Sequence, residues 1–549
     1  MTTLDMTPGA QIPRLDIGPQ TMVTQALAST AYRDGELDAL VKLQPDVKPK
    51  EPRFRLFRAN LGEAFTEAVI ARTLGNGRAA LVPSFGVDPR MVVEHCLEAQ
   101  ELRNQRDRKL TLVTLLTGVL FLPGTLLWLA AFQLRAMVKK SAGNRAGLYG
   151  GIVLAALGLL GVLLIWRPPA SGVLGLYLRL MLFAPVIGWF VARRICLTST
   201  EELRARWLGL VEGNALGPLL PKLVPKDDND STATRLREQL DRLAAEQETN
   251  VLHYAGTKGV LGLGRRWASW HLTGPLKPRE GVPDLHAFHP WDLVRRITDR
   301  LGSLDRSEVS GGGMPHAQLR QWVVMAVGEG AGEVSRPSGA ETMDGPRMRD
   351  FAVQNICNEQ KFGGGQPRHY QGTQFVLWGG QLVVSLLTNV TVLHNYLRVE
   401  VTAYALGPIA GLFNGKPSPR QVSFTRPGRP WKTESRQLPV VDSDEVVRLA
   451  VRAPLMWAPV IRDWIGGRLV LPEPFGLRSA WTDGMWTHRF MADDAIRATT
   501  PIVRLVRTAL DEFLADHDVD VDHFAKGHSL NPGSEAEGVR PGKPDVYDA

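Results

Sequence analysis

The stretch that decides the fold runs from Leu110 to Leu134 and reads LTLVTLLTGVLFLPGTLLWLAAFQL. Two further apolar blocks follow it, Leu148 to Trp166 and Gly172 to Cys196. A helix needs about 20 predominantly apolar residues to cross the roughly 30 Å hydrocarbon core of a bilayer, and each block is about that long. We therefore expect a membrane block at 110–197, with soluble regions on both sides of it in the chain.

The connections inside this block indicate how its helices are paired. Residues 167–172 read Arg-Pro-Pro-Ala-Ser-Gly, a helix stop too short to be anything but the loop of an antiparallel hairpin between the second and third blocks. The first block has Pro123-Gly124 at its centre, which could kink a spanning helix or turn a shallow re-entrant hairpin. Both alternatives stay open, so we expect two or three transmembrane helices.

Basic residues flank the block in three clusters, and they weigh the two topologies. The clusters are Arg103, Arg106, Arg108 and Lys109 before the first block, Arg135, Lys139, Lys140 and Arg145 after it, and Arg193, Arg194, Arg204 and Arg206 after the third. A re-entrant first block followed by a two-pass hairpin puts all three clusters inside, as the positive-inside tendency favours. We therefore favour a multi-pass protein of the plasma membrane whose soluble regions are cytoplasmic. Three true passes are the main alternative.

The fold class predicted for the whole chain is α+β, with transmembrane helices between an N-terminal helical region and C-terminal soluble domains. The predicted divisions are disordered residues 1–20, a mainly helical region 21–109, the membrane block 110–197 (110–134, 148–166 and 172–196), a small α+β domain 198–310, a linker or irregular stretch 311–345, a domain of β-meander and helices 346–525, and a disordered tail 526–549.

Apolar spacing and capping residues predict the helices. The predicted helices are one or a pair within 21–43, one at 54–74, one that begins at Asp88-Pro89 and enters the membrane without a break, one that begins at Thr198, one at 231–249, one that ends near Leu301, one from Asp442 to Arg452, and a last one at 501–516. The apolar stripe of the last helix needs a partner, which we expect to be the sheet.

The clearest strand pattern lies between Gly372 and Leu406. Two apolar runs, 372–378 and 381–388, flank Gly379-Gly380, a dipeptide typical of hairpin turns, and a third run covers 390–406. We therefore predict an antiparallel meander of about three strands. Shorter strands are predicted at 250–254, 267–272 and 321–327.

Composition excludes several functions. The formal charge of +8 and the pI near 9.4 could indicate nucleic-acid binding, but part of the excess is the set of basic residues beside the apolar blocks. Topology explains those charges more simply, so nucleic acid is disfavoured as a partner. Only Cys96, Cys196 and Cys357 occur, too few for a four-cysteine zinc site or a disulfide framework. We expect no cofactor and no metal.

Two stretches are candidate ligand sites, and each fails as a motif. The loop Gly256 to Gly264 matches neither of the glycine-rich phosphate motifs and leads into a predicted strand, so we interpret it as a structural turn. Residues 516–523 read Asp-His-Asp-Val-Asp-Val-Asp-His and begin like a calcium loop, but His523 stands where the glycine belongs and Ser529 where the bidentate glutamate belongs. A solvated acidic helix end is the better interpretation.

Single residues give weaker signals. Cys357 and His369 could form a thiol and its base, although a lone cysteine is more often simply buried. The pairs His286/His289 and His369/His394 lack a companion metal motif. Arg179 inside the third block could mark a transport path, but no acidic partner occurs in the three blocks, so snorkelling to the interface is favoured.

Tryptophans are numerous beyond the membrane block, and several lie near arginines, as in Arg266-Trp267 and Arg462-Asp-Trp464. Stacking on nucleic-acid bases, contact with a membrane interface and core packing all use tryptophan. The sequence does not separate these three uses.

Residues 250–264, NVLHYAGTKGVLGLG, and residues 377–385, LWGGQLVVS, are similar to motifs of a loose family of uncharacterised actinobacterial integral membrane proteins. The resemblance covers residues 235–410 and the general layout. It implies a bacterial membrane address, and it implies no mechanism and no catalytic residues.

Together these patterns predict a membrane-anchored cytoplasmic interaction or regulatory protein without a recognisable catalytic site. Its expected partners are the lipid bilayer and one or more proteins. The alternatives are a membrane-bound enzyme with a cryptic site in the C-terminal soluble region, for which a pocket lined by His253, Lys258 or Arg265 would be the sign, and a transporter component.

Overall fold

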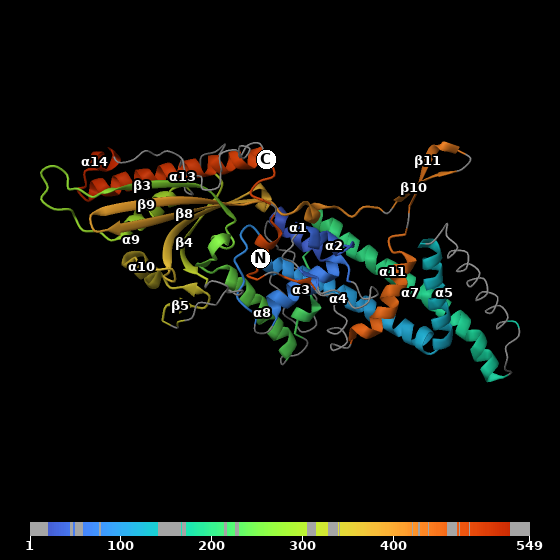
Figure 1. Cartoon of the computed structure of the whole chain (residues 1–549). Coiled ribbons are helices and arrows are strands. Elements are labelled where there is room, and N and C mark those ends of the chain that lie inside the picture. Colours follow the sequence, from blue (N-terminus) through green and yellow to red (C-terminus); the bar gives the residue numbers. More distant parts are fainter. Residues whose placement is uncertain are drawn as a thin grey trace.

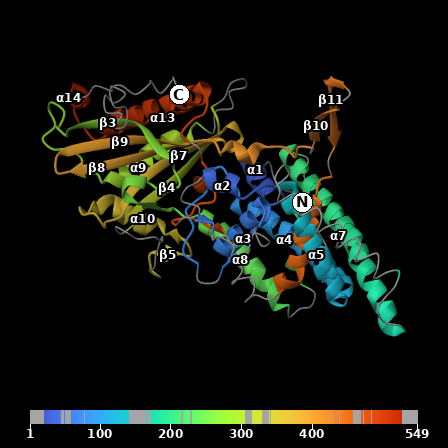
Figure 2. The ribbon, with the colours of Figure 1, turned by 45° about the vertical axis from the view of Figure 1, so that its right-hand side comes forward.

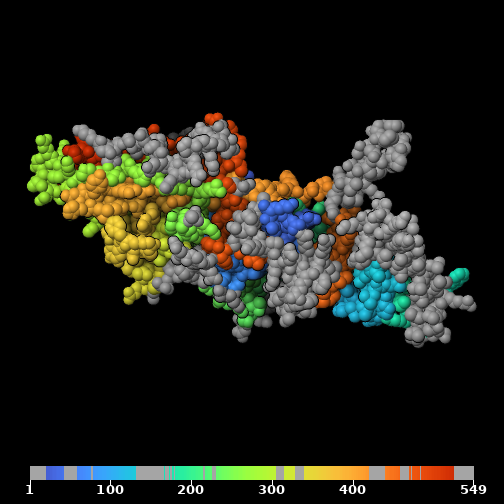
Figure 3. Space-filling model, in the orientation of Figure 1, coloured from blue at the N-terminus to red at the C-terminus, as the bar shows by residue number. Residues whose placement is uncertain are grey.

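The computed structural model describes residues 20–43, 48–49, 59–75, 78–140, 166, 172–213, 217–225, 230–304, 314–327, 339, 341–419, 421–426, 429–437, 439–457, 469–471, 473–482 and 484–526. The predicted disorder at 1–20 and 526–549 and the predicted second apolar block at 148–166 fall almost wholly outside these residues. Within them the protein is α+β and elongated, with a sheet at one end, the N-terminal helices in the middle and the helices α5 and α7 at the other end (Figure 1). The space-filling view has the same outline (Figure 3).

The N-terminal helices form the middle of the molecule. They are α1 (Met22–Thr30), α2 (Asp38–Leu43), α3 (Leu61–Leu74) and α4 (Pro89–Val113), joined there by α8 (Ser231–Gln247). The predicted pair of helices within 21–43 is confirmed. Asp88 caps α4 as expected, because its carboxylate accepts a hydrogen bond from the backbone N–H of Met91.

The first apolar block is not a straight helix. From Val113 the chain continues without a break into the π-helix η2 (Thr114–Val119) and then turns by 101° into α5 (Leu122–Lys140). The Pro123-Gly124 pair lies in the first turn of α5, directly after this bend. A turn of this kind fits a broken span or a re-entrant loop.

The third apolar block belongs to α7 (Val173–Val211), a helix of 39 residues. The prediction that a helix begins at Thr198 is wrong, because α7 runs through this position. The Thr198 hydroxyl donates hydrogen bonds back to the carbonyl oxygens of Arg194 and Ile195, 3.1 Å away in each case, instead of capping a new helix. Among the described residues, α7 is long and apolar enough to cross a membrane. The bent pair of α4–η2 and α5 gives a second candidate if its two helices form one span.

One sheet of six strands organises the C-terminal half. The strands are β2 (Val251–Tyr254), β3 (Arg265–Pro275), β4 (Ala317–Ala326), β7 (Arg368–Leu377), β8 (Leu382–Leu393) and β9 (Tyr396–Leu406), in the spatial order β2-β4-β7-β8-β9-β3. All neighbours are antiparallel except β2 and β4, which are parallel. Segments 198–310 and 346–525, for which we predict separate domains, both contribute strands to this sheet, and so does the predicted linker 311–345.

The predicted meander is confirmed in β7, β8 and β9, with Gly379-Gly380 in the first turn. The second turn lies at His394-Asn395, inside the third apolar run at 390–406, because β8 continues through Asn389 to Leu393. The strand pattern alone did not locate it, because residues 381–406 are apolar on both sides of the turn.

Helices cover one face of the sheet. They are α9 (Pro290–Gly302), α10 (Asp350–Glu359) and α13 (Arg489–Asp516), followed by α14 (Val521–Lys526). The last predicted helix does pack on the sheet, but it begins 12 residues before Pro501, which is inside α13. Figure 2 shows α13 lying along the sheet, with α5 and α7 beside each other at the opposite end.

The remaining elements are short. They are β1 (Lys48–Pro49) paired with β12 (Leu469–Val470), β5 (Met343–Asp344) paired with β6 (Arg347–Met348), the hairpin β10 (Gln421–Arg426) and β11 (Arg429–Gln437), and α11 (Ser443–Arg452). The hairpin projects from the body of the molecule (Figure 1), and α11 follows it along the chain and returns to the base of α7.

Candidate functional site

Helix α11 joins the C-terminal half to the apolar helices. Its acidic first turn follows Asp442, and Val446 and Leu449 lie on its buried face. These two side chains pack in one apolar cluster with Leu110 of α4 and with Ala192 and Cys196 of α7. Because α4 and α7 cover this face, α11 fixes the position of the C-terminal half on these two helices.

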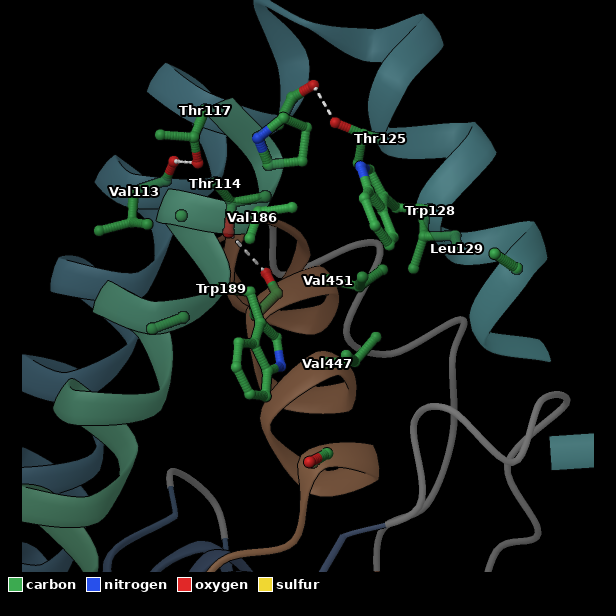
Figure 4. A pocket seen from close by; sticks show the side chains of 17 residues that line it. Val113, Thr114, Thr117, Thr125, Trp128, Leu129, Val186, Trp189, Val447 and Val451 are labelled. Atoms are coloured by element: carbon green, nitrogen blue, oxygen red, sulfur yellow. Dashed lines mark hydrogen bonds between the residues drawn. The ribbon is translucent and has the colours of Figure 1, made fainter. Parts of the chain in front are cut away.

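A cavity of about 440 Å³ lies between the first apolar block, α7 and α11 (Figure 4). Its walls are mostly apolar, and five elements contribute to them: the last residue of α4, η2, α5, α7 and α11. The lining residues that the argument below uses are Thr114 and Thr117 of η2, Thr125 and Trp128 of α5, Trp189 of α7, and Val447 of α11. A cavity of this volume is in the range of about 300–1,000 Å³ that is typical of small-molecule sites.

Three threonine side chains that line the cavity are engaged with the backbone. Thr117 donates to the carbonyl oxygen of Val113 at 2.7 Å, and Thr125 donates to that of Gly118 at 2.9 Å. Thr114 donates to Ala450 of α11 at 2.9 Å, so this hydrogen bond also ties η2 to α11. Each of these hydroxyl groups therefore already donates its hydrogen to a backbone carbonyl oxygen of the protein.

Close backbone approach brings the walls together. A Cβ atom on Gly188 of α7 would lie 2.0 Å from Oγ1 of Thr117, so only glycine allows α7 and η2 to pack at this distance. On the other side, the indole N–H of Trp128 donates to the carbonyl oxygen of Leu182 at 3.0 Å and holds α5 against α7. The helices that line the cavity are therefore held at separations set by specific residues.

A buried ionic cluster lies where α11 ends. Arg452 forms a two-pronged ion pair with Glu63 of α3, with Nη1 3.0 Å from Oε2. Burial raises the pKa of the Glu63 carboxyl, but the charges of Arg452 and Arg106 outweigh it and lower the pKa to about 2. In α4, Arg106 pairs with Asp107 at 2.7 Å. The cluster keeps α3, α4 and α11 together at the edge of the apolar block.

A second buried network joins α7 to the N-terminal helices. The hydroxyl of Tyr32 donates to Glu98 at 2.5 Å and lies 2.9 Å from Nδ1 of His95. Arg206 of α7 reaches the other carboxylate oxygen of Glu98 at 3.0 Å. Burial is the main cause that raises the pKa of Tyr32 well above its ordinary value. Tyr32, His95 and Glu98 are buried, and only Arg206 is partly exposed, so we interpret the network as a structural link.

The predicted pair Cys357 and His369 lines a different cavity, of about 490 Å³, at the end of the sheet far from α5 and α7. Burial raises the pKa of the Cys357 thiol to about 12 and lowers the pKa of His369 to about 4. Both groups are therefore neutral at pH 7, and this arrangement does not generate the thiolate that cysteine catalysis needs.

The rim of this distal cavity is apolar and exposed. Phe362, which is 79% exposed, stands on it with Leu393 and Tyr396. Arg398 and Glu400 line the same cavity and form an ion pair at 2.8 Å. Exposed aromatic side chains beside charged groups are typical of protein-binding surfaces.

Sequence reasoning missed a polar row on β3 and β9. The Ser269 hydroxyl lies 3.2 Å from Nε2 of His271, and Nδ1 of His271 lies 3.9 Å from a carboxylate oxygen of Glu400. The order of groups is that of a serine hydrolase relay, but 3.9 Å is too long for a hydrogen bond and Ser269 is only 4% exposed. The strand register explains why these groups are neighbours. Ser269 and His271 are two residues apart on β3, so their side chains lie on the same face, and His271 is opposite Glu400 of β9.

The glycine loop is a structural turn, as predicted. The N–H of Ala255 donates to the carbonyl oxygen of Gly259, and that of Leu261 donates to His253, so these amides are not left for an anion. Gly264 has a φ of +85°, and a Cβ there would lie 2.2 Å from the carbonyl oxygen of Ala405. His253 lines a cavity of about 340 Å³, whereas Lys258 and Arg265 do not line it.

The acidic stretch 516–523 serves the fold. Asp520 accepts a hydrogen bond from the backbone N–H of His523 at the start of α14, and Asp518 pairs with His286 at 3.3 Å. Within the described ranges no group of three or more histidine, cysteine, aspartate or glutamate side chains could hold a metal ion.

The other residues that the sequence singled out either pack in the protein or lie outside the described part of the structure. Trp267 packs on Trp270 and Trp486, with ring centroids 6.2 and 5.7 Å away, in the core beneath the sheet. Trp481 is buried in the helical core. Both therefore have packing roles. Arg179 lies in α7, and its side chain is outside the described part of the structure.

The fold and the site define an α+β protein with one or two helices long and apolar enough to cross a membrane. Residues 269–533 match a protein family described as the AbeC-like domain. The match runs from within β3 to beyond α14 and includes α11, and it overlaps the segment for which we noted a family resemblance. The actinobacterial source stays a prediction. Neither the curated proteins nor the solved structures contain a significant match to this chain.

Proposed function

We propose that this protein is a bacterial plasma-membrane protein that holds an interaction or regulatory domain at the cytoplasmic surface. One observation carries the proposal. Helix α7 exposes Phe183, Ile187 and Phe190 in its first part and buries Trp207 and Leu210 in the helical core in its last part. Exposed apolar side chains in such number need a lipid environment, and the unbroken helix then holds the soluble region at a fixed position relative to the bilayer.

The packing also supports the topology that we favour. From Leu110 to Val119 the first apolar block rises about 15 Å, half of the roughly 30 Å hydrocarbon core, before it bends. We propose that it is re-entrant and that the later apolar blocks form a two-pass hairpin. Arg206 pairs with Glu98, so the basic clusters around α4 and after the third block lie on the same side of the apolar helices. The positive-inside tendency places that side in the cytoplasm.

We propose the distal cavity as the place where a protein partner binds. It lies at the end of the molecule opposite α5 and α7, so a partner could reach it without meeting the membrane. Its rim offers aromatic anchors and its wall an exposed charge pair, the combination found at interaction hot spots.

Fractionation and a reporter test the anchoring. The full chain should stay in the membrane pellet after an alkaline carbonate wash, and a fluorescent protein fused after Lys526 should fold in the cytoplasm. Alkaline phosphatase fused at the same position should be inactive. A soluble chain would refute the anchoring, and active phosphatase would refute the cytoplasmic orientation.

Crosslinking tests the partner site. A photoreactive amino acid replacing Phe362 should give a discrete protein adduct in cells. The same replacement at Phe351, which is exposed on α10 and does not line the cavity, is the matched control. Adducts of the same kind and yield from both positions would refute a specific partner at the distal cavity.

A further inference from the structure

The cavity between η2, α5, α7 and α11 is surrounded by an outward-facing apolar surface. Its lining residues alternate along the helices with exposed ones. The exposed apolar residues next to the lining ones are Leu112, Leu116 and Val119 on the first helix and Ile187 and Phe190 on α7. A molecule that enters the cavity therefore comes from the apolar surroundings that these exposed side chains contact.

Water is a poor occupant of the cavity. Bound water needs about two to four hydrogen-bond partners, and the hydroxyls of Thr114, Thr117 and Thr125 already donate to backbone carbonyls. The remaining wall is mostly valine, alanine, glycine and leucine. The chemistry of the wall thus selects an apolar guest.

The positively charged side chain of Arg193 lies beside Trp189 at one edge of the cavity. The guanidinium of Arg193 lies 5.6 Å from the ring centroid of Trp189, whose side chain lines the cavity. Arg194 is exposed beside it on the same turn of α7. A phosphate group at this edge would meet positive charge, and Arg is well suited to bind phosphate through its planar fork of donors.

We propose that the cavity binds one acyl chain of an anionic phospholipid, with the lipid phosphate against Arg193. This inference rests on the membrane location proposed above. The apolar wall takes the hydrocarbon, the cation takes the headgroup charge, and the surrounding leucines, isoleucine and phenylalanine face the bilayer that supplies the lipid.

Occupancy of the cavity also affects the docking of α11. The wall that α11 contributes consists of Ser443, Val447, Ala450 and Val451, and Arg452 at the end of the same helix makes the ion pair with Glu63. A lipid that fills the cavity stabilises the arrangement in which α11 is docked, because a ligand that binds one state selectively raises its population. The bound lipid therefore strengthens the link between the AbeC-like segment and the membrane helices.

Lipid retention by the full chain tests the proposal. The protein is purified in detergent, delipidated and mixed with micelles that contain either phosphatidylglycerol or phosphatidylcholine. Native mass spectrometry then counts the bound lipids, and thermal unfolding gives the midpoint. We expect one phosphatidylglycerol to be retained about tenfold more strongly than phosphatidylcholine and to raise the midpoint.

Two variants with matched controls locate the site. Val447→Phe fills the cavity from α11 and should abolish retention, whereas Val191→Phe, the same change at an exposed position of α7 that does not line the cavity, should not. Arg193→Gln should keep lipid retention and remove the preference for the anionic headgroup. Arg497→Gln, an exposed position on α13 with the same loss of charge, should leave the preference unchanged.

The outcomes separate the two proposals. If the chain floats with vesicles but all four variants retain lipid like the parent, the lipids are merely annular and the specific site is refuted. If lipid is retained without a headgroup preference in the parent, the role of Arg193 is refuted. If the parent does not float with vesicles, the proposed membrane anchoring itself fails. Should Val447→Phe not fold, the Arg193→Gln result still decides the headgroup assignment.

Discussion

Helices α7 and α13 are both long and both carry apolar side chains, but they place these side chains in opposite surroundings. Both are long, 39 and 28 residues, and each has a proline inside it, Pro185 and Pro501. α13 buries its apolar face against α9 and the sheet. α7 exposes much of its apolar surface, with Ile187 59% and Phe190 57% exposed. An apolar helix face has to be covered by other apolar groups. The neighbouring elements decide whether protein or lipid covers it.

The ion pairs differ between the two regions in the same way. Around the base of α7 the charges are buried, as in Glu63–Arg452. Along α13 they are exposed, as in the pair between Arg300 of α9 and Glu512, 3.0 Å apart. Buried pairs are costly to break because the remaining charge has no solvent, whereas exposed pairs contribute little.

The largest expected effect breaks the buried pair. Arg452→Met leaves Glu63 buried without its partner and should lower the free energy of unfolding by about 3–5 kcal/mol. The control Arg300→Met removes an exposed pair and should cost less than about 1 kcal/mol. Urea unfolding of the full chain in detergent micelles measures both. Equal losses in the two variants would mean that burial does not distinguish the two regions.

The second prediction compares the two apolar faces directly. Leu510→Ala removes a buried side chain of α13 and should cost about 2–5 kcal/mol. Ile187→Ala removes an exposed side chain of α7 and should change the free energy of unfolding by no more than about 0.5 kcal/mol. The urea midpoint, followed by tryptophan fluorescence, is the measurement. A large loss for Ile187→Ala would show that protein covers this face of α7.

The third prediction uses the acid response of the two regions. His369 has a folded pKa of about 4 against an ordinary value of 6.5, so the unfolded chain binds the proton first. Its contribution to stability is present above pH 6.5 and is lost as the pH falls toward 4. His369→Gln should therefore flatten the stability curve in this window.

Glu63 gives the contrast for the acid response. Its pKa is lowered to about 2 from 4.5, so its contribution is complete above pH 4.5 and disappears only as the pH falls toward 2. Glu63→Gln should change the curve below pH 4.5 while the slope between pH 6.5 and 4.5 stays as in the parent. An unchanged slope in that upper window for His369→Gln would contradict the assignment to His369.

The smallest expected effect concerns the continuity of α7. Replacing an N-cap threonine by alanine costs about 1 kcal/mol, whereas an exposed threonine inside a helix is neutral or slightly unfavourable compared with alanine. Thr198→Ala should therefore change the free energy of unfolding by less than about 0.5 kcal/mol, with a sign toward greater stability. A loss of about 1 kcal/mol would restore Thr198 as a cap.

Local patterns predicted many of the elements of this protein. Asp88-Pro89 located the start of α4, and Gly379-Gly380 located the first turn of the meander. The failures occurred where tertiary contacts overrode a local signal. Pro501 resembles a helix start, yet α13 begins at Arg489 because Met491, Ala495 and Ala498 are buried in the core between α13 and the sheet. Thr198 resembles a cap, yet the following turns of α7 are held by the N-terminal helices.

The candidate site was hidden from the sequence for a similar reason. Its wall combines Thr117, Trp189 and Val447, which are far apart in the chain and belong to no motif. The ion pair beneath it joins Glu63 to Arg452, 389 residues apart. Only the register of the sheet placed Ser269 and His271 beside Glu400. The burial of Ser269 and the 3.9 Å between His271 and Glu400 favour a structural role for this row.

The sequence by itself determined the need for apolar surroundings at 110–134 and 172–196, the α+β class and the strands of the meander, because hydrophobic length and periodicity are properties of the local chain. The tertiary structure decided the bend of the first apolar block, the single long helix through Thr198, the joining of distant segments in one sheet and the cavity against α11. These features depend on which surfaces meet, and the free energy of that contact exceeds the small local preferences for a cap or a helix start.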